Sequence, residues 1–523
     1  MAGNIFTQVA MSKPGQSTFN LNHDVKFSMD MGKLVPVNLQ EVLPGDSFRL
    51  SFANMIRFAP MISPVMHRVR VRTDYFFVPN RILWAGWEDF ITGNLDASAN
   101  PMATIALGQT QSDSAFQLNS LGDYLGYPTV PDDIQVDVMR FNALPLAAYW
   151  KIYDDYYRDQ NLQIERFVPL EYDDNSPQYG ADSTRATLAF RAWPHDYFTS
   201  ALPFAQKGDV VQVPLTATQD IPVNLNVGAL QNWVRSDLTQ AATGSLAETL
   251  GHTKDPSTAE DIWLDPSGTY TVDVQGQAAD INSLRRAIKL QEWLERNARG
   301  GTRYTESIMA HFGTRSSDAR LQRPELIGSH LQNVTISEVL STAQEVQSAP
   351  TDIPVGYMAG HGISVGGGKS MHYYAEEHGW IMGIISVLPD TAYQQGVPRH
   401  LSRVDPLDYA WPTFANLGEQ EIKVKELYAG AADPDATFGY IQRYAEYKYC
   451  ASRVAGEFRD NLSFWHMGRI FDNEPVLNSQ FISADPTTRI FAVQSGDAAK
   501  LYCHTYNMVS VRRKLPYFGI PSI

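Results

Sequence analysis

Glycine, lysine and serine stand together in Gly366-Gly367-Gly368-Lys369-Ser370, and nucleotide-binding loops use these residue types to cradle a phosphate. That motif also requires a glycine at position 363, which is Ile363 in this chain. The run Met371 to Tyr374 that follows is typical of extended or irregular backbone, whereas the motif needs a helix. The sequence therefore predicts a glycine-rich turn at a crowded contact, because glycine permits close backbone approach.

Histidine and glutamate gather just beyond this motif, where His361, His372 and His378 stand close to Glu376 and Glu377. Metal centres and acid–base sites use these residue types. The spacing matches neither the HExxH arrangement nor a Cys/His metal pattern. We expect hydrogen-bonding roles at a surface or an interface, and we predict no metal, no cofactor and no enzymatic activity.

Two further groups of acidic residues have the residue types of a catalytic carboxylate pair or a calcium loop, but not the spacing that those sites need. Asp154 and Asp155 are adjacent on a predicted helix, where neighbouring side chains diverge and cannot act as a carboxylate pair. Lys151 and Asp155 have the spacing of a helical ion pair. The segment from Tyr172 to Ser183 is rich in aspartate, but it lacks the central glycine and final glutamate of a calcium loop. We predict structural roles for both groups.

Short strands separated by long irregular stretches are the dominant structural signal. Val69 to Phe77 alternates between apolar and polar residues, as expected for a half-buried strand. Comparable segments are Ser47 to Phe52, Thr187 to Ala192, Val210 to Pro214, Ile381 to Leu388, Ile422 to Lys425, Ile490 to Gln494 and Tyr506 to Arg512. About eight such strands predict a mainly β protein, an antiparallel jelly-roll sandwich with long loops and a few helices. Periodicity does not give the order of the strands.

Helical periodicity is clearest in the segment that begins at Leu284, where Leu284, Ile288 and Leu294 recur at helical spacing. Gly300-Gly301 ends this predicted helix. A second helix is predicted over Tyr149 to Tyr157, and its stripe of Trp150, Tyr153 and Tyr157 indicates packing.

The composition is compatible with a protein that is covered by neighbouring subunits. Charged residues make up 19% of the chain and aromatic residues 11%, and interface cores lose charge while they gain aromatic residues. A large monomer with a good core has the same composition, and composition alone favours that alternative. The net charge of −15 argues against a chain coated with nucleic acid, which needs a basic surface. Local arginine clusters, or a separate basic partner, would have to make any such contact.

Two cysteines, Cys450 and Cys503, form no disulfide framework, and we expect two buried free thiols. The first 19 residues lack the pattern of a secretion signal. The longest apolar run, Trp380 to Pro389, is far shorter than the roughly 20 residues that a membrane helix needs. We expect it to form a buried strand.

The segment from Thr216 to Asp280 is acidic and poor in bases, with nine acidic residues against two basic ones. Asp237, Glu248, Asp255 and Asp261 are among the acidic residues. Its composition, rich in Ala, Thr, Ser, Gln and Gly, predicts an inserted acidic surface loop.

Five stretches resemble the major capsid protein of microviruses, and most of all its gokushovirus-like branch. The stretches are Leu284 to Gly328, Phe19 to Leu50, Leu144 to Asn161, Val355 to Pro389 and Tyr444 to Phe464. Together with the hydrophobic C-terminus, the resemblance covers nearly the whole chain outside residues 216 to 280.

This resemblance implies one viral jelly-roll domain over residues 1–523 that self-assembles into a T=1 icosahedral shell around a circular single-stranded DNA phage genome. It implies contacts with an internal scaffolding protein, a small basic DNA-packaging protein, a DNA pilot protein and the genome, which is bound without regard to sequence. In such capsids the insertion at 216–280 is an outward protrusion that meets a host surface receptor. The chain would belong to the virion capsid and assemble in the cytoplasm of the bacterial host.

The candidate contact residues follow from this interpretation. Arg512, Arg513 and Lys514 are the candidates for touching DNA. Candidates for contacts between subunits or for anchoring loops are Arg315, Arg320, Arg323, Gly366, Gly367 and Gly368. Asp237, Glu248, Asp255 and Asp261 are the candidates for host contact. Two alternatives remain open: a β-rich carbohydrate-binding or depolymerising phage protein, and a nucleotide-handling enzyme that uses the Gly366 loop.

Overall fold

The structure of the chain is a computed structural model, and it describes part of the sequence. The described residues are 15–92, 104–107, 116–129, 139–170, 183–209, 211, 233–235, 252–254, 261–264, 281–301, 303–315, 317–340, 358–493 and 498–518. No helix within these ranges is long and apolar enough to cross a membrane. Two compact units divide the chain, one formed by residues 1–207 with 295–523 and the other by residues 208–294.

Eight strands of the first unit pair in the order of a jelly roll. These strands are β2 (His23–Met29), β3 (Val35–Val42), β4 (Ser47–Phe58), β5 (Val69–Pro79), β11 (Glu325–Asn333), β13 (Met358–Gly367), β15 (Gly379–Pro389) and β18 (Leu501–Arg513). β2 pairs with β18, β3 with β15, β4 with β13 and β5 with β11, and every pair is antiparallel. Among these eight strands the first, β2, pairs with the last, β18, and the fourth, β5, pairs with the fifth, β11. This is the nested pairing of a ribbon wound into two sheets.

Three more strands widen the larger sheet. They are β1 (Ser17–Asn20), β12 (Thr335–Leu340) and β14 (Met371–Tyr374), so this sheet has seven strands while the smaller sheet keeps four. The predicted mainly β architecture with antiparallel sheets is confirmed. Four of the predicted strand segments lie in β4, β5, β15 and β18.

The other predicted strand segments had mixed outcomes. Thr187 to Ala192 contains only isolated bridges at Phe190 and Ala192, so that prediction was wrong. In Ile490 to Gln494, the described residues up to Val493 contain one isolated bridge, at Phe491, so the predicted strand was wrong there too. Ile422 to Lys425 ends the short strand β16 (Glu419–Lys423) and then turns into the helix α9 (Val424–Leu427). Val210 to Pro214 lies almost entirely outside the described residues.

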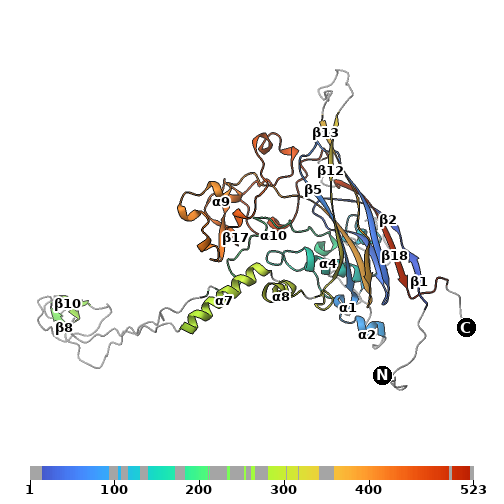
Figure 1. The fold of residues 1–523 in the computed structure, drawn as a ribbon, viewed down its shortest axis with the longest axis horizontal. Coiled ribbons are helices and arrows are strands. Elements are labelled where there is room, and N and C mark those ends of the chain that lie inside the picture. The colour runs from blue at the N-terminus through green and yellow to red at the C-terminus, as the bar shows by residue number, and fades with distance from the viewer. Residues whose placement is uncertain are drawn as a thin grey trace, which may run out of the picture. The chain divides into compact units, whose positions relative to one another are not determined.

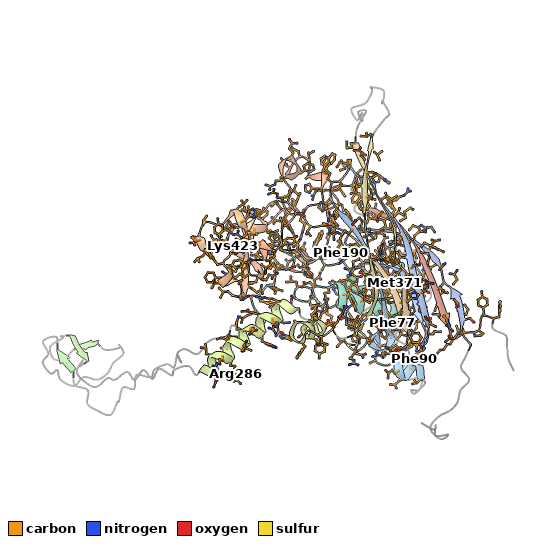
Figure 2. The ribbon with its side chains drawn as sticks, in the orientation of Figure 1. Phe77, Phe90, Phe190, Arg286, Met371 and Lys423 are labelled. Carbon is orange, nitrogen blue, oxygen red and sulfur yellow. The ribbon has the colours of Figure 1, made fainter. Side chains whose placement is uncertain are left out.

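The space between the two sheets is filled by large apolar side chains and a few paired polar groups. Residues from both sheets form this core: Val42, Phe48, Leu50, Phe52, Tyr75, Phe77, Ala375, Ile381, Val509 and Val511. Figure 2 places Phe77 and Met371 in this sandwich. The Tyr75 hydroxyl donates to Asn507 Oδ1 at 2.9 Å, and Asn507 Nδ2 donates to the carbonyl of Val37 at 2.7 Å. Because buried polar groups are costly when they lack a partner, these bonds fix how the two sheets align.

Helices cover the outer face of the smaller sheet. The helix α4 (Leu144–Ile152) continues into one turn of π-helix, η1 (Tyr153–Tyr157), and packs on β5 and β15. The prediction that one face of β5 is exposed is therefore wrong beyond Thr73. Asp74 is buried there, and its carboxylate accepts bonds from Arg72 at 2.9 Å and from the Tyr157 hydroxyl at 2.8 Å. The larger sheet has no comparable helical layer among the described residues.

A second core supports a lobe beside the sandwich, which Figure 1 marks with α9 and β17. Its strands are β16 and β17 (Thr437–Gln442), and its buried residues include Phe198, Tyr393, Ile422, Leu427 and Phe438. The short helices of this region are η2 (Arg399–Leu401), η3 (Pro406–Asp408), η4 (Pro412–Phe414), η5 (Ala445–Tyr447), η6 (Gly456–Arg459), η7 (Ser463–Trp465) and α10 (Ser479–Ile482).

The remaining elements are short, apart from one long helix. In the first unit they are α1 (Asn80–Leu83), α2 (Trp87–Thr92), α3 (Leu121–Leu125), α6 (Ser183–Ala186), α8 (Tyr304–Phe312), β6 (Thr104–Leu107) and β7 (Met139–Asn142). The second unit contains an antiparallel sheet of β8 (Trp233–Arg235), β10 (Asp261–Leu264) and β9 (His252–Lys254). The predicted helix is confirmed as α7 (Ile281–Gly300), and the division between the units falls within it.

Candidate interaction surfaces

An exposed apolar loop is the most conspicuous candidate for protein contact, and it comprises residues 398–417 of the lobe. Its large apolar residues face solvent: Leu401, Val404, Leu407, Tyr409, Trp411 and Leu417. Val404 is 94% exposed and Leu401 is 68% exposed. A concentration of apolar side chains on the surface marks a contact site, because water makes its exposure unfavourable. Sequence reasoning missed this loop, since its apolar residues follow no helical or strand period.

Internal bonds hold the apolar loop in one conformation. Asp408 accepts the backbone N–H groups of Val404 at 2.9 Å and Asp405 at 3.0 Å, and these two bonds hold the pKa of its carboxyl below the ordinary value. Arg403 pairs with Glu446 at 3.0 Å and lies over the Tyr447 ring at 4.3 Å. A loop that is already ordered loses little entropy when it docks.

Proline also stiffens the apolar loop. Pro406 and Pro412 occupy the first turns of the short helices η3 and η4, where the fixed backbone angle of proline suits the conformation. The side chain of Trp411 donates to the carbonyl of Pro406 at 2.9 Å. The loop thus presents apolar side chains on a rigid frame.

The three arginines predicted to anchor loops have different surroundings. Arg323 donates to Thr305 Oγ1 at 3.1 Å and to the carbonyl of Asp155 at 3.1 Å, and its guanidinium lies 4.4 Å from the centre of the Tyr156 ring. It therefore ties the loop before β11 to η1 and α8 of the same chain. Arg315 and Arg320 are exposed. Their predicted role at contacts between subunits stays a prediction.

Gly366, Gly367 and Gly368 lie at a β-bulge rather than in a turn. Gly367 is paired opposite Ala53, and Met371 is paired opposite Leu50. The chain therefore advances four residues from Gly367 to Met371 while β4 advances three, which leaves one extra residue between β13 and β14. A side chain at Gly368 would meet the Phe52 ring at 2.4 Å, and one at Gly366 would meet Gln332 Oε1 at 2.4 Å. The crowding that requires glycine here comes from the chain itself. Nothing at the bulge resembles a phosphate-binding loop, because a strand follows it.

The basic residues at the end of β18 do not share one environment. Arg513 pairs with the buried Asp46 at 2.8 Å and donates to the carbonyl of Glu41, so its guanidinium is used inside the fold. Arg512 and Lys514 are exposed. Of the candidate DNA contacts, these two remain accessible.

Most of the candidate residues in the acidic segment are not among the residues that the structure describes. Asp237, Glu248 and Asp255 lie outside the described residues. Asp261 begins β10, where its backbone is paired opposite Lys254. The predicted role in host contact stays a prediction.

The acidic groups considered above as possible catalytic residues have structural partners. Glu377 pairs with Arg81 at 2.6 Å. Asp154 is buried, where it accepts the backbone N–H groups of Arg166 and Phe167 at 2.9 and 2.6 Å. Burial raises the pKa of Asp154 although these bonds oppose that shift. Among the described residues no group of three or more His, Cys, Asp or Glu side chains is placed to hold a metal ion.

Comparison with known proteins places this geometry in a family. The family described as "Capsid protein (F protein)" matches residues 7–523. This chain belongs to that family. It is 34% identical to the capsid protein VP1 of Chlamydia phage 1 and 35% identical to that of Bdellovibrio phage phiMH2K, and each comparison covers 99% of this chain and 98% or 97% of the relative. The capsid protein VP1 of Spiroplasma virus 4 is 28% identical, over 97% of this chain and 95% of the relative.

Family membership settles the broad role of the chain. It is a structural major capsid protein of the microvirus type, it assembles with copies of itself into a shell, and that shell is the capsid of a virion. The family is structural, which agrees with the predicted absence of enzymatic activity. The exposed apolar loop is the feature of the described residues that such a role most directly explains.

Proposed function

We propose that the chain builds a closed T=1 icosahedral shell around a circular single-stranded DNA genome, and that the apolar loop makes a principal contact between copies. The observation that supports this proposal is the combination of exposed apolar side chains and a rigid frame at residues 398–417. Each copy offers its loop to one neighbour and receives a loop from another. Such a head-to-tail contact closes into rings when the rotation between copies is a whole fraction of a turn.

Arg315 and Arg320 would supplement this contact at the edges of the subunit. Both are exposed, and arginine forks suit carboxylates across an interface. A chain with a net charge of −15 offers many such carboxylates on a neighbouring copy. Polar contacts of this kind add specificity around an apolar centre.

The remaining partners are those that the resemblance to microvirus capsids implies, and the charge of the chain agrees with one of them. An acidic chain cannot neutralise a whole genome, so a small basic DNA-packaging protein would supply most of the positive charge. An internal scaffolding protein would guide closure, and a DNA pilot protein would accompany the genome. Assembly would take place in the cytoplasm of the bacterial host. The free Cys450 and Cys503 support that proposal, because a reducing compartment keeps thiols unpaired.

Residues 216–280 would form the outward protrusion that meets a host surface receptor. The segment has nine acidic residues against two basic ones, which suits a position in solvent and away from packed DNA. Deleting it should leave particles that assemble normally but adsorb poorly to host cells. Loss of assembly in that variant would assign the segment to the shell itself.

The direct experiment is electron microscopy of the purified chain together with its scaffolding partner. We expect closed particles of uniform diameter in negative stain. The chain with Val404→Asp should give free subunits under the same conditions, since an acidic group would then be buried against an apolar surface. If the unmodified chain gave only monomers or small oligomers across a range of salt and pH, the proposal would be refuted.

A further inference from the structure

The outer face of the larger sheet is an uncovered β-sheet surface in the part of the chain that the structure describes. Side chains alternate along each strand, so the outward positions of β18 begin Tyr502, His504, Tyr506 and continue to Arg512. Cross-strand pairs place their neighbours on the same face: Tyr502 stands between Ser28 and Arg57, and His504 between Lys26 and Met55. The helices α4 and η1 cover the other sheet.

This face is basic although the chain is acidic. The outward positions of β1, β2, β4, β14 and β18 contain four basic residues, namely Lys26, Arg49, Arg57 and Arg512. One acidic residue, Asp24, shares the outward positions of those strands, and it accepts a bond from His504 Nε2 at 2.8 Å. A surface with an excess of positive charge, in a chain with a net charge of −15, is a local site for a polyanion.

Exposed tyrosines lie between these basic side chains. Tyr502 is 51% exposed and Tyr374 is 60% exposed. Tyr506 is partly exposed, and its hydroxyl accepts a bond from Asn22 Nδ2 at 3.2 Å, which steadies the ring. Tyr502 and Tyr506 are four residues apart on one strand, so their rings are separated by roughly 13 Å. Aromatic side chains on a sheet, flanked by cations, form the surface on which single-stranded nucleic acids stack their bases.

A hollow of about 890 Å³ lies at one end of this face. Lys26, Arg57, Tyr502 and His504 line it from the sheet, and Asp123 lines it from α3. Asp123 already accepts the backbone N–H of Asn119 at 2.9 Å. In this hollow, two cations and a tyrosine converge where a nucleotide could place both its phosphate and its base.

We infer that the outer face of the larger sheet binds a single strand of nucleic acid, with phosphates held by Lys26, Arg57, Arg49 and Arg512 and bases stacked on Tyr502, Tyr506 and Tyr374. The inference rests on the proposed shell in one respect: the enclosed genome can reach this face only where the face lines the interior of the shell. It also revises the candidates drawn from the sequence, since Arg513 is held by Asp46 while Arg512 lies on the face. No base edge is read, so binding is independent of sequence.

The test measures binding of a fluorescein-labelled oligodeoxythymidine strand, roughly 20 nucleotides long, to the full chain kept below its assembly concentration. Fluorescence anisotropy is recorded over a series of salt concentrations. The variants are Arg57→Gln, Arg49→Gln, Tyr502→Ala and, as a matched control on the exposed surface of α7, Arg286→Gln. Each altered side chain is exposed, and the unfolding temperature of each variant verifies that the fold is intact.

Cations and tyrosines should have separable effects. Each arginine variant on the face should lower the slope of log affinity against log salt by about 0.7, the value for one phosphate contact with a single strand. Tyr502→Ala should weaken binding roughly five- to 150-fold and leave the salt slope unchanged, because it removes stacking and no charge. Arg286→Gln should behave like the unmodified chain.

Two results would overturn the inference. One is binding by the arginine and tyrosine variants that equals that of the unmodified chain. The other is equally tight binding of polyglutamate, which has no bases to stack and would assign the face to an acidic protein partner. Either result, together with normal particles in the microscope, would refute the binding surface and leave the proposed shell standing. Failure of the unmodified chain to form particles would refute the shell independently.

Discussion

Shortening Val404 to alanine should weaken assembly by about tenfold without weakening the fold. The side chain is 94% exposed in the single chain, so almost all of its burial would come from a neighbouring copy. Val404→Ala removes two carbon groups, each worth about 0.8 kcal/mol when buried, which gives about 1.5 kcal/mol for each contact. That free energy corresponds to roughly a tenfold rise in the protein concentration at which shells form.

The assay is light scattering during assembly over a series of protein concentrations, combined with thermal unfolding of the unassembled chain. Val424→Ala is the matched control, because it removes the same atoms from a side chain that is only 4% exposed in the core of the lobe. That variant should lose roughly 2–3 kcal/mol of folding stability, since a cavity adds to the lost burial. Well below its unfolding temperature, it should still assemble near the normal concentration. The reasoning fails if Val404→Ala assembles at the concentration of the unmodified chain.

Three other substitutions or treatments test the geometry of single residues. Arg323→Ala should cost roughly 2–4 kcal/mol in urea unfolding, because it leaves the Asp155 carbonyl and Thr305 without their donor, whereas the exposed Arg320→Ala should change stability by less than about 0.5 kcal/mol. The lowered pKa of Asp408 means that its bonds stabilise the apolar loop above the ordinary value of 3.8 and are lost as pH falls through the lowered value. Amide exchange at Val404 and Asp405 should therefore stay slow at pH 5 and become fast in Asp408→Ala, which removes the accepting oxygen; slow exchange in that variant would contradict the assigned bonds. A thiol reagent should modify Cys450, which is exposed, and spare Cys503 in the folded chain, because burial raises the pKa of that thiol to about 12; modification of both would show that the sheet opens.

The sequence predicted the elements whose signal is local. Alternation gave β5, an unbroken apolar run gave β15, and helical spacing gave α7, because each of these signals lies within its own segment. Segments with glycine at close contacts were harder to predict. Gly366 and Gly367 were interpreted as part of a turn, although they end the strand β13, because they lack the side chains that define a strand pattern. The expected burial of Cys450 was also wrong, since that residue is exposed.

Features that depend on contacts between distant parts of the chain could not be predicted from the sequence. Asp74 looked like a solvent-facing residue of β5, yet Tyr157 from η1 and Arg72 satisfy it in the interior. Arg512 and Arg513 are adjacent and looked equivalent, but strand alternation directs Arg513 to Asp46 and leaves Arg512 on the outer face. The apolar loop follows no period, so only its exposure in three dimensions distinguishes it from a buried segment.

A reconstruction of assembled particles by cryo-electron microscopy tests the central claim most directly. The account predicts a closed T=1 shell in which residues 398–417 are buried against a neighbouring copy and the face bearing Tyr502 and Arg57 is turned to the interior. Particles with the apolar loop in open solvent, or with that face on the outside, would contradict it.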